Sequence, residues 1–111
     1  MSYTPDRRDF MWFDFDPQAG HEQAGRRPAL VLSPRTYNER VGLVIVCPVT
    51  SRIKGHLFEV HIPSGLPISG VVLSDQIRSL DLKARNPAFI VQVSEAFVKD
   101  VLARLDTLLR A

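Results

Sequence analysis

The sequence contains little cysteine and no long apolar run. Its one cysteine, Cys47, cannot form a disulfide within the 111-residue chain, which is typical of proteins from a reduced compartment. The longest uncharged apolar stretch, residues 41–49, is interrupted by a glycine and a proline and is far shorter than the roughly 20 residues that cross a bilayer. The N-terminal residues include no apolar segment of the kind that a signal peptide needs. We therefore expect a cytoplasmic protein without a membrane span.

The sequence also lacks the standard signatures of catalysis. It contains no nucleophile elbow G-x-S-x-G, no zinc-protease motif H-E-x-x-H, no Walker loop and no dinucleotide-binding G-x-G-x-x-G. Its histidines and its cysteine do not have the spacing of a zinc site. Hydrolysis by a bound metal and reactions of nucleotide cofactors are therefore disfavoured, and we expect neither a metal nor a cofactor.

What is present is the composition of one ordinary folded domain. Hydrophobic residues make up 45% of the chain and charged residues 23%, values that are typical of a folded protein and not of a disordered tail. A chain of 111 residues leaves no room for a second hydrophobic core, and no stretch has the composition of a linker. We expect residues 1–111 to form a single domain.

The charge is mild in total but unevenly distributed. The formal net charge is +2, yet residues 20–55 contain six basic and two acidic residues, a local net charge of +4. Eleven of the 14 basic residues are arginines, whose planar guanidinium suits phosphate better than the ammonium of lysine does. This pattern favours a polyanion as partner, and a solvated basic face is the alternative.

Periodicity predicts strands along most of the chain. Residues 43–49 are uncharged and rich in β-branched side chains, which is typical of a central strand that is buried on both faces. The connecting segments predict a long loop over 18–26 and a helical turn over 35–40. Alternation and short apolar runs predict the other strands, over 9–16, 29–32 after an opening Pro28, 58–62, 71–82 as one long strand or a bent pair, and 88–93.

The last segment predicts an amphipathic helix of about four turns. Ser94 is a good N-cap, Glu95 complements the helix dipole, and apolar residues recur at helical spacing from Phe97 to Leu109. Short strands followed by one helix indicate a mainly β fold, in which a small antiparallel sheet is curled or forms a partly open barrel. We expect the apolar stripe of the helix to cover the barrel, and a dimer interface is the alternative.

Several motifs occur in the order and approximate spacing of a known family. They are W-x-D-F-D-P at 12–17, G-x-E-Q-x-G-x-R-P at 20–28, L-S-P at 32–34, P-x-T at 48–50 and D-Q at 75–76. By these motifs the chain resembles the MazF/PemK family of toxin endoribonucleases, from residue 9 to the terminal helix. The resemblance implies a small SH3-like antiparallel barrel of the MazF, PemK and CcdB type with a C-terminal helix.

The resemblance also implies an activity and partners. It implies a homodimer that cleaves single-stranded RNA, such as mRNA, at short sequence motifs and without a metal. The 2′-hydroxyl of the RNA attacks the adjacent phosphorus and leaves a 2′,3′-cyclic phosphate and a 5′-hydroxyl end. It further implies a cognate antitoxin of a type II toxin-antitoxin system, whose acidic, disordered segment we expect in the RNA groove, around Arg26, Arg27, Arg52 and Lys54.

By the same resemblance, the catalytic residues are Arg27 of the R-P step and Thr50 of the P-x-T strand end. A guanidinium is a poor general base in water, so we expect Arg27 chiefly to stabilise the phosphate while Thr50 donates its hydroxyl to a non-bridging oxygen. Glu22 is a third catalytic candidate. It either pairs with Arg26, or it holds Arg27 or assists proton transfer. The candidates for substrate binding are Gln23, Arg26, Ser51, Lys54, Asp75 and Gln76, of which the last two would read base edges.

These assignments have structural alternatives that the sequence leaves open. Thr50 could serve only a backbone group at the strand end, and Asp75 and Gln76 could be ordinary turn residues. Phe15 is expected in the core, with base stacking as the alternative. Imidazoles are an obvious means of moving the proton, and the chain has His21, His56 and His61. The family motif does not demand His21 or His56, which lie in loops near the site, and we interpret these two as surface residues.

Two functions of other classes remain as alternatives. A toxin family of the same fold binds DNA gyrase without cleaving anything, so the fold alone does not establish an enzyme. That family carries its key tryptophan at the C-terminus, whereas the only tryptophan here is Trp12. A non-enzymatic RNA-binding barrel would keep the basic stretch and make Thr50 dispensable. RNA cleavage discriminates between these alternatives and the endoribonuclease.

Overall fold

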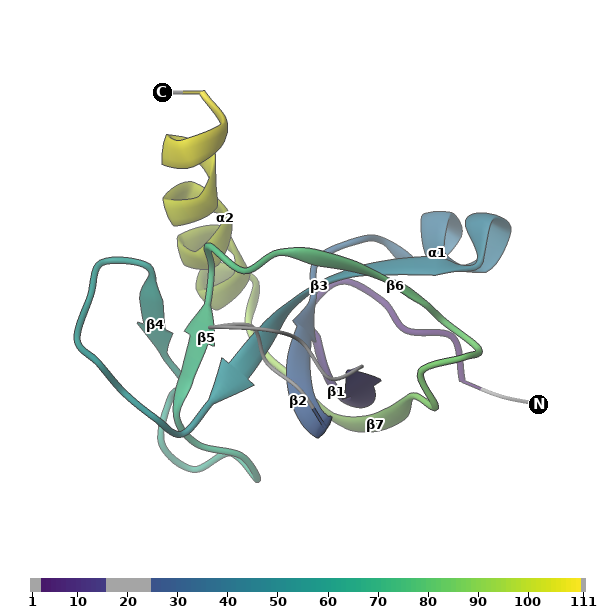
Figure 1. Ribbon diagram of the computed structural model, residues 1–111, viewed down its shortest axis with the longest axis horizontal. Helices are drawn as coiled ribbons and strands as arrows, with labels where there is room; N and C mark the ends of the chain where they lie inside the picture. Colours follow the sequence, from purple (N-terminus) through teal and green to yellow (C-terminus); the bar gives the residue numbers. More distant parts are fainter. Residues whose placement is uncertain (1–2, 16–24, 111) are drawn as a thin grey trace.

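A computed structural model describes residues 3–15 and 25–110, which contain seven strands and two helices (Figure 1). The elements are, in chain order, β1 (Asp9–Phe15), β2 (Gly25–Val31), α1 (Arg35–Val41), β3 (Leu43–Thr50), β4 (Glu59–His61), β5 (Val71–Leu73), β6 (Arg78–Asp81), β7 (Ala88–Gln92) and α2 (Glu95–Leu109). Within the described ranges, no helix is both long and apolar enough to cross a membrane.

The strands form one antiparallel sheet that is organised around β3. The strand order is β4-β5-β3-β2-β1-β7, and β6 also pairs with β3. One edge of β3 pairs with β2, while β6 pairs with residues 43–46 of β3 and β5 pairs with Val49 and Thr50. The segment 71–82 is therefore a bent pair of strands. The expected mainly β fold with a C-terminal helix is confirmed, with a sheet that does not close, because β4 and β7 end the strand order without pairing with each other among the described strands.

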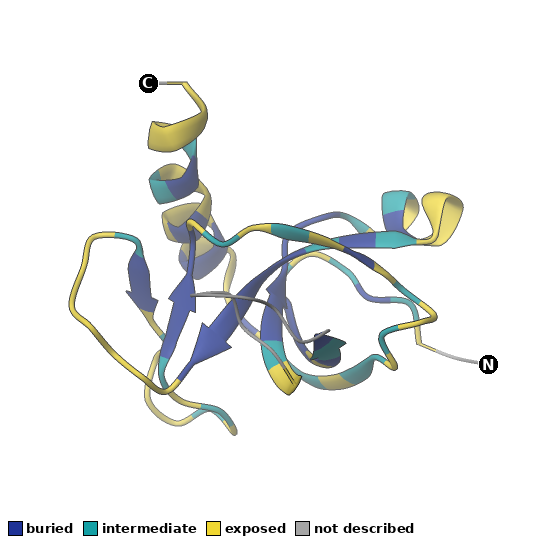
Figure 2. Cartoon of the chain, in the orientation of Figure 1, coloured by how far each residue is buried: buried dark blue, intermediate teal, exposed yellow. Residues whose placement is uncertain are grey.

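Helix α2 covers one face of this sheet. Ser94 caps the helix as predicted, because its hydroxyl accepts a hydrogen bond from the backbone nitrogen of Phe97. Figure 2 shows buried residues in the first turns of α2 and exposed residues at its C-terminal end. The helix thus covers the sheet, as expected, through a cluster that includes Phe10, Leu30, Val49, Val72, Phe97, Val98, Val101 and Leu105. Leu108 and Leu109 belong to the predicted stripe but are exposed.

A second apolar cluster lies on the other face of β1, β2 and β3. It uses the alternate positions of the same strands, because successive side chains of a strand point to opposite faces. Its buried members are Met11, Phe13, Phe15, Ala29, Val31, Val44, Val46 and Leu80, which we call the β-face cluster. Phe15 is therefore a core residue, as expected, and the central strand β3 is buried from both sides.

Two boundaries differ from the sequence-based prediction. Strand β2 begins at Gly25, not after Pro28, and Pro28 pairs with Trp12 inside the strand. The ladder between β2 and β3 begins only at Ala29, so the missing N–H of proline lies where one edge of β2 has no registered partner among the described strands. The expected helical turn is the helix α1, which ends at Gly42 in the left-handed conformation (φ 79°) that glycine adopts without strain.

Candidate active site

Three polar residues extend the β-face cluster where its apolar residues end. Side chains two positions apart on a strand share a face. Arg27 lies two positions before the buried Ala29 on β2, and Thr50 lies four positions after the buried Val46 on β3. Arg78 lies two positions before the buried leucine of β6. The alternation therefore brings Arg27, Thr50 and Arg78 to the same face of the sheet.

The strand register sets Arg27 between β1 and the end of β3. On one side, Arg27 is paired with Phe13 of β1. On the other side, the ladder with β3 ends at the pair of Ala29 with Pro48, so Arg27 lies two residues beyond the last registered pair on β2 and Thr50 lies two residues beyond it on β3. Arg27 is exposed, whereas only 7% of Thr50 is accessible. A ligand at this point would meet an accessible guanidinium and a hydroxyl that is fixed by its strand.

The side-chain hydroxyl and the backbone carbonyl of Thr50 both have close neighbours. Its Oγ1 accepts a hydrogen bond from the backbone nitrogen of Arg52 at 3.1 Å. The strand-end role that the sequence left open is thus present, but accepting this bond leaves the hydroxyl proton free to donate. Gly70 approaches the carbonyl of Thr50 so closely that a Cβ at residue 70 would lie 2.3 Å from the oxygen. These contacts fix Thr50 at the end of β3.

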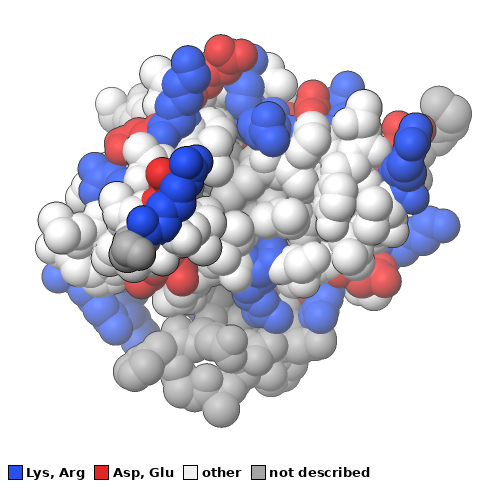
Figure 3. All heavy atoms as spheres, turned by 90° about the horizontal axis from the view of Figure 1, so that it is seen from above, with Lys and Arg blue, Asp and Glu red and all other residues white. Residues whose placement is uncertain are grey.

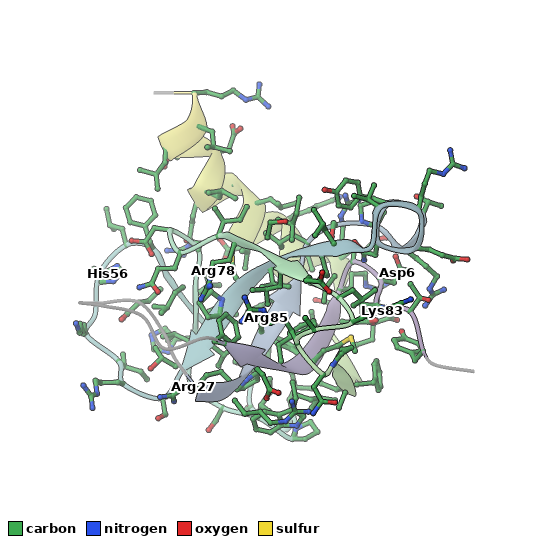
Figure 4. The ribbon with its side chains drawn as sticks, turned by 45° about the vertical axis from the view of Figure 1, so that its right-hand side comes forward. Asp6, Arg27, His56, Arg78, Lys83 and Arg85 are labelled. Carbon is green, nitrogen blue, oxygen red and sulfur yellow. The ribbon has the colours of Figure 1, made fainter. Side chains whose placement is uncertain are left out.

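Arg78 is the residue at this face that the sequence analysis missed. Its guanidinium lies 5.1 Å above the ring of the buried Phe15, a cation–π contact that orients its planar fork. Arg85 follows β6, and its carbonyl accepts a hydrogen bond from the backbone nitrogen of Asp14. Figure 4 shows Arg78 and Arg85 near each other in that view, with Arg27 near the start of β2. Arg78 could have been identified from the sequence because it is a basic residue two positions before Leu80, where the alternation of a strand predicts an inward side chain.

Arg26 lies on the opposite face of β2 from Arg27. Its Nη1 donates to Oδ1 of Asp14 at 2.9 Å and to the carbonyl of Asn86. Both charged side chains are well exposed, so this ion pair contributes little to stability. The structure therefore does not bring the substrate-binding candidate Arg26 to the face shared by Arg27 and Thr50. The face seen in Figure 3 likewise mixes basic and acidic side chains and has no patch of a single sign.

The other described candidates lie on two segments beside β5. Ser51 and Lys54 are exposed in the connection from β3 to β4. Asp75 and Gln76 lie in the turn between β5 and β6, where the backbone nitrogen of Gln76 donates to the carbonyl of Leu73 at 3.1 Å. Arg78 follows this turn directly, so the turn leads into the face that carries Arg27 and Thr50.

The remaining expectations for the site concern residues of the first loop and the histidines. Glu22, Gln23 and His21 lie outside the described residues. His56 is exposed, as expected, and His61 is exposed as well. Nε2 of His56 lies 3.8 Å from a carboxylate oxygen of Glu59, away from Arg27 in the view of Figure 4.

Cys47 is a fully buried core residue, as expected. Burial, with a smaller contribution from the charge of Asp75, raises the pKa of its thiol to about 12. The thiol is therefore protonated at neutral pH and unsuited to act as a nucleophile. In residues 3–15 and 25–110, no group of three or more histidine, cysteine, aspartate or glutamate side chains gathers that could hold a metal ion.

Curated relatives match nearly the whole chain. The endoribonuclease toxin MazF of Escherichia coli K12 is 41% identical over 107 residues, which cover 96% of each chain. Endoribonuclease PemK of Escherichia coli is 39% identical and aligns with 94% of this chain and 81% of its own length. These similarities run through the segments that carry Arg27, Thr50 and Asp75.

Solved structures of the same kind share the fold closely. A crystal structure of MazF from Deinococcus radiodurans superposes with a TM-score of 0.94 at 49% identity, covering 99% of this chain and all of its own. A MazE-MazF structure from the same organism gives a TM-score of 0.88 at 50% identity and covers 97% of both chains. The family model for PemK-like, MazF-like toxins of type II toxin-antitoxin systems matches residues 6–109. The chain is therefore a member of this PemK-like, MazF-like toxin family, as the sequence motifs predict.

Proposed function

We propose that this chain is an endoribonuclease toxin that cleaves single-stranded RNA by the attack of the RNA's own 2′-hydroxyl, without a bound metal. The curated relatives are named endoribonucleases, which gives the class of activity. The observation that carries the chemistry is the common sheet face of Arg27, Thr50 and Arg78 at the end of the β-face cluster.

The reaction needs charge stabilisation and proton transfer rather than an enzyme nucleophile. The 2′-oxygen forms a bond to phosphorus and loses its proton, while the bond from phosphorus to the 5′-oxygen breaks and that oxygen gains a proton. The products are a 2′,3′-cyclic phosphate and a 5′-hydroxyl end. Negative charge builds up on the phosphoryl oxygens in the transition state, so donors fixed in place beforehand accelerate the reaction.

Arg27 and Arg78 supply two guanidinium groups for this charge. Arg27 is accessible at its strand, and the stacking of Arg78 on Phe15 holds the second guanidinium without extra ordering cost on binding. The Thr50 hydroxyl donates a hydrogen bond to a non-bridging oxygen. Its oxygen already accepts a hydrogen bond from the backbone nitrogen of Arg52, and its proton is the part that can bind the phosphate. Glu22 is the candidate for the proton transfer, because a guanidinium is a poor base.

The remaining candidates bind the RNA on either side of this centre. Lys54 and Ser51 contact phosphates from the connection between β3 and β4, together with Gln23 of the first loop. Arg26 lies on the opposite face of β2 and would contact the RNA outside this centre. The side chains of Asp75 and Gln76 carry the acceptors and amide donors that read the edges of unstacked bases. Trp12 is partly exposed beside Pro28, in keeping with a place near the groove of a homodimer.

The direct test is cleavage of a long single-stranded RNA by the purified protein in EDTA. We expect fragments that end in a 2′,3′-cyclic phosphate and a 5′-hydroxyl, which end-specific labelling identifies. RNA that stays intact at micromolar protein contradicts the proposed reaction. RNA that is bound but uncut would favour a non-enzymatic binding barrel, and neither binding nor cleavage would favour a toxin that acts on a protein.

Replacing Thr50 with alanine should slow cleavage about 10²-fold, because the transition state loses one fixed donor. The measurement is the single-turnover rate on a short cleavable RNA. Thr36→Ala, at an exposed position on α1, is the matched control and should leave the rate unchanged. A Thr50→Ala rate within about twofold of the wild type would reject the role of the hydroxyl.

We further propose an antitoxin whose acidic, disordered segment occupies the RNA groove around Arg26, Arg27, Arg52 and Lys54. The MazE-MazF structures of Deinococcus radiodurans support a partner of this kind. Titration of a short, uncleavable RNA against the preformed complex should release the antitoxin, and added salt should weaken its binding. If RNA and antitoxin bind together with undiminished affinity, inhibition acts by distorting the site instead.

A further inference from the structure

A buried carboxylate holds the connection between β3 and β4. Glu59 is the first residue of β4 and is only 5% exposed. Its Oε1 accepts a hydrogen bond from the backbone nitrogen of Gly55 at 2.6 Å, and its Oε2 accepts one from the backbone nitrogen of Lys54 at 2.9 Å. Gly55 has a φ of 86°, and this left-handed turn points both N–H groups at one anion.

The backbone N–H groups around Glu59 stabilise the ionised form of its carboxyl group. The hydrogen bond from the backbone of Lys54 is the largest of the effects that lower the pKa of Glu59, and those from Gly55 and His56 act in the same direction against the cost of burial. The carboxylate is therefore ionised at neutral pH. Two N–H donors and one anion make charge-assisted bonds, which are stronger than bonds between neutral groups.

Residues 51–57 have little else that orders them. Every residue of this segment is exposed, so it lacks the apolar packing that fixes the strands. Its described anchors are the carboxylate of Glu59, the Thr50 hydroxyl at one end and, from α2, Arg104, whose Nη1 donates to the carbonyl of Leu57. Near the other end, the carbonyl and Nδ1 of His56 accept hydrogen bonds from the backbone nitrogens of Glu59 and Phe58. Of these, only Glu59 reaches the middle of the segment, next to Lys54.

Glu59 also lies at the junction with the second proposed RNA-binding segment. The carbonyl of Phe58 accepts hydrogen bonds from the backbone nitrogen of Ser74 at 2.9 Å and from its hydroxyl at 2.7 Å. Ser74 is fully buried and directly precedes Asp75, and Glu59 itself pairs with Leu73. The two segments that carry Lys54 and Asp75 are thus joined at the start of β4.

We propose that Glu59 is a positioning residue, which holds the backbone of residues 51–58 in the conformation that binds RNA. This inference rests on the proposed function. Loss of this role should weaken RNA binding and leave the chemical step unchanged, because Glu59 holds the segment of Lys54 but makes no described contact with Arg27 or Arg78. Releasing the segment adds an ordering cost to RNA binding and leaves the reacting groups in place.

The test is Glu59→Gln, which keeps the length of the side chain but removes the charge and one acceptor. Glu39→Gln, the same change at an exposed position on α1, is the matched control. Hydrogen exchange at the amides of Lys54 and Gly55 should become about tenfold faster or more in Glu59→Gln alone. The dissociation constant of an RNA with a 2′-deoxy cleavage site, and the KM, should rise about tenfold while kcat stays within about threefold.

Each other outcome decides against the inference. Unchanged exchange means that Glu59 does not hold the segment, and faster exchange with unchanged RNA affinity means that the segment does not bind RNA. Faster exchange throughout the sheet means a general structural role, and a fall in kcat alone means that Glu59 acts on the reaction step and not on RNA binding. If circular dichroism shows that Glu59→Gln does not fold, Glu59→Asp keeps the charge, shortens its reach and should give the same changes to a smaller extent. A wild type that neither binds nor cleaves RNA defeats the proposed function, whereas the exchange result still reports on the anchor itself.

Discussion

Arg27→Ala should abolish RNA cleavage and leave the fold intact. The guanidinium is exposed and belongs to neither apolar cluster, so its removal costs little stability. In the proposed reaction it stabilises charge that develops only in the transition state, and loss of such a group slows phosphoryl transfer by about 10³-fold or more. The single-turnover rate measures the effect, and circular dichroism and the urea midpoint measure the fold.

Arg40→Ala is the matched control for this prediction. Arg40 is an exposed arginine in the last turn of α1, outside the segments assigned to RNA. Its replacement should change the cleavage rate by less than about twofold. If Arg27→Ala loses its circular dichroism spectrum together with its activity, Arg27 is a structural residue. If it keeps its activity, the assignment of Arg27 is wrong.

Gly70→Ala should destabilise the protein more than other single methyl additions. The new Cβ would lie 2.3 Å from the carbonyl oxygen of Thr50, which is backbone and cannot rotate away. The φ of Gly70 is 112°, a conformation that side chains disfavour. Overpacking and backbone strain together should lower the free energy of unfolding by roughly 3 kcal/mol or more, as measured by urea denaturation.

Gly42→Ala separates the two causes. Gly42 also has a positive φ, of 79°, but a Cβ there meets nothing within 4 Å, so only the strain of about 1 kcal/mol remains. Equal losses in the two variants would show that the approach to Thr50 is not close. A Cβ at residue 70 would displace the backbone of Thr50, so the folded fraction of Gly70→Ala should also cleave RNA more slowly.

The strands were predictable because their periods are local. Residues 43–49 are uncharged and rich in β-branched side chains, and the helix from Glu95 follows a good N-cap and has an apolar stripe, so both elements form where the pattern indicates. The boundary at Pro28 was wrong because a proline in a strand depends on which edge has a partner, which is a tertiary fact.

The composition of the site was only partly predictable. The family motifs named Arg27 and Thr50, but the shared face with Arg78 depends on the pairing of β6 with β3, which no local pattern determines. Arg26 and Arg27 are neighbours in the sequence, yet the alternation of β2 separates them. Glu59 followed the expected alternation of a strand, and nothing in the sequence indicated that a carboxylate would be buried under its own preceding loop.

The pairing of β1 with β7 has a consequence for the order in which the sheet is completed during synthesis. Residues 9–12 of the first strand pair with residues 88–92 of the last, so the sheet is completed by contacts between the two ends of the chain. For such non-local pairing, the chain loses the conformational entropy of a long closed loop before the stabilising contacts between the strands form. On the ribosome, this edge of β1 stays unpaired until residues 88–92 have emerged. The sheet is therefore completed only after β7 has been synthesised.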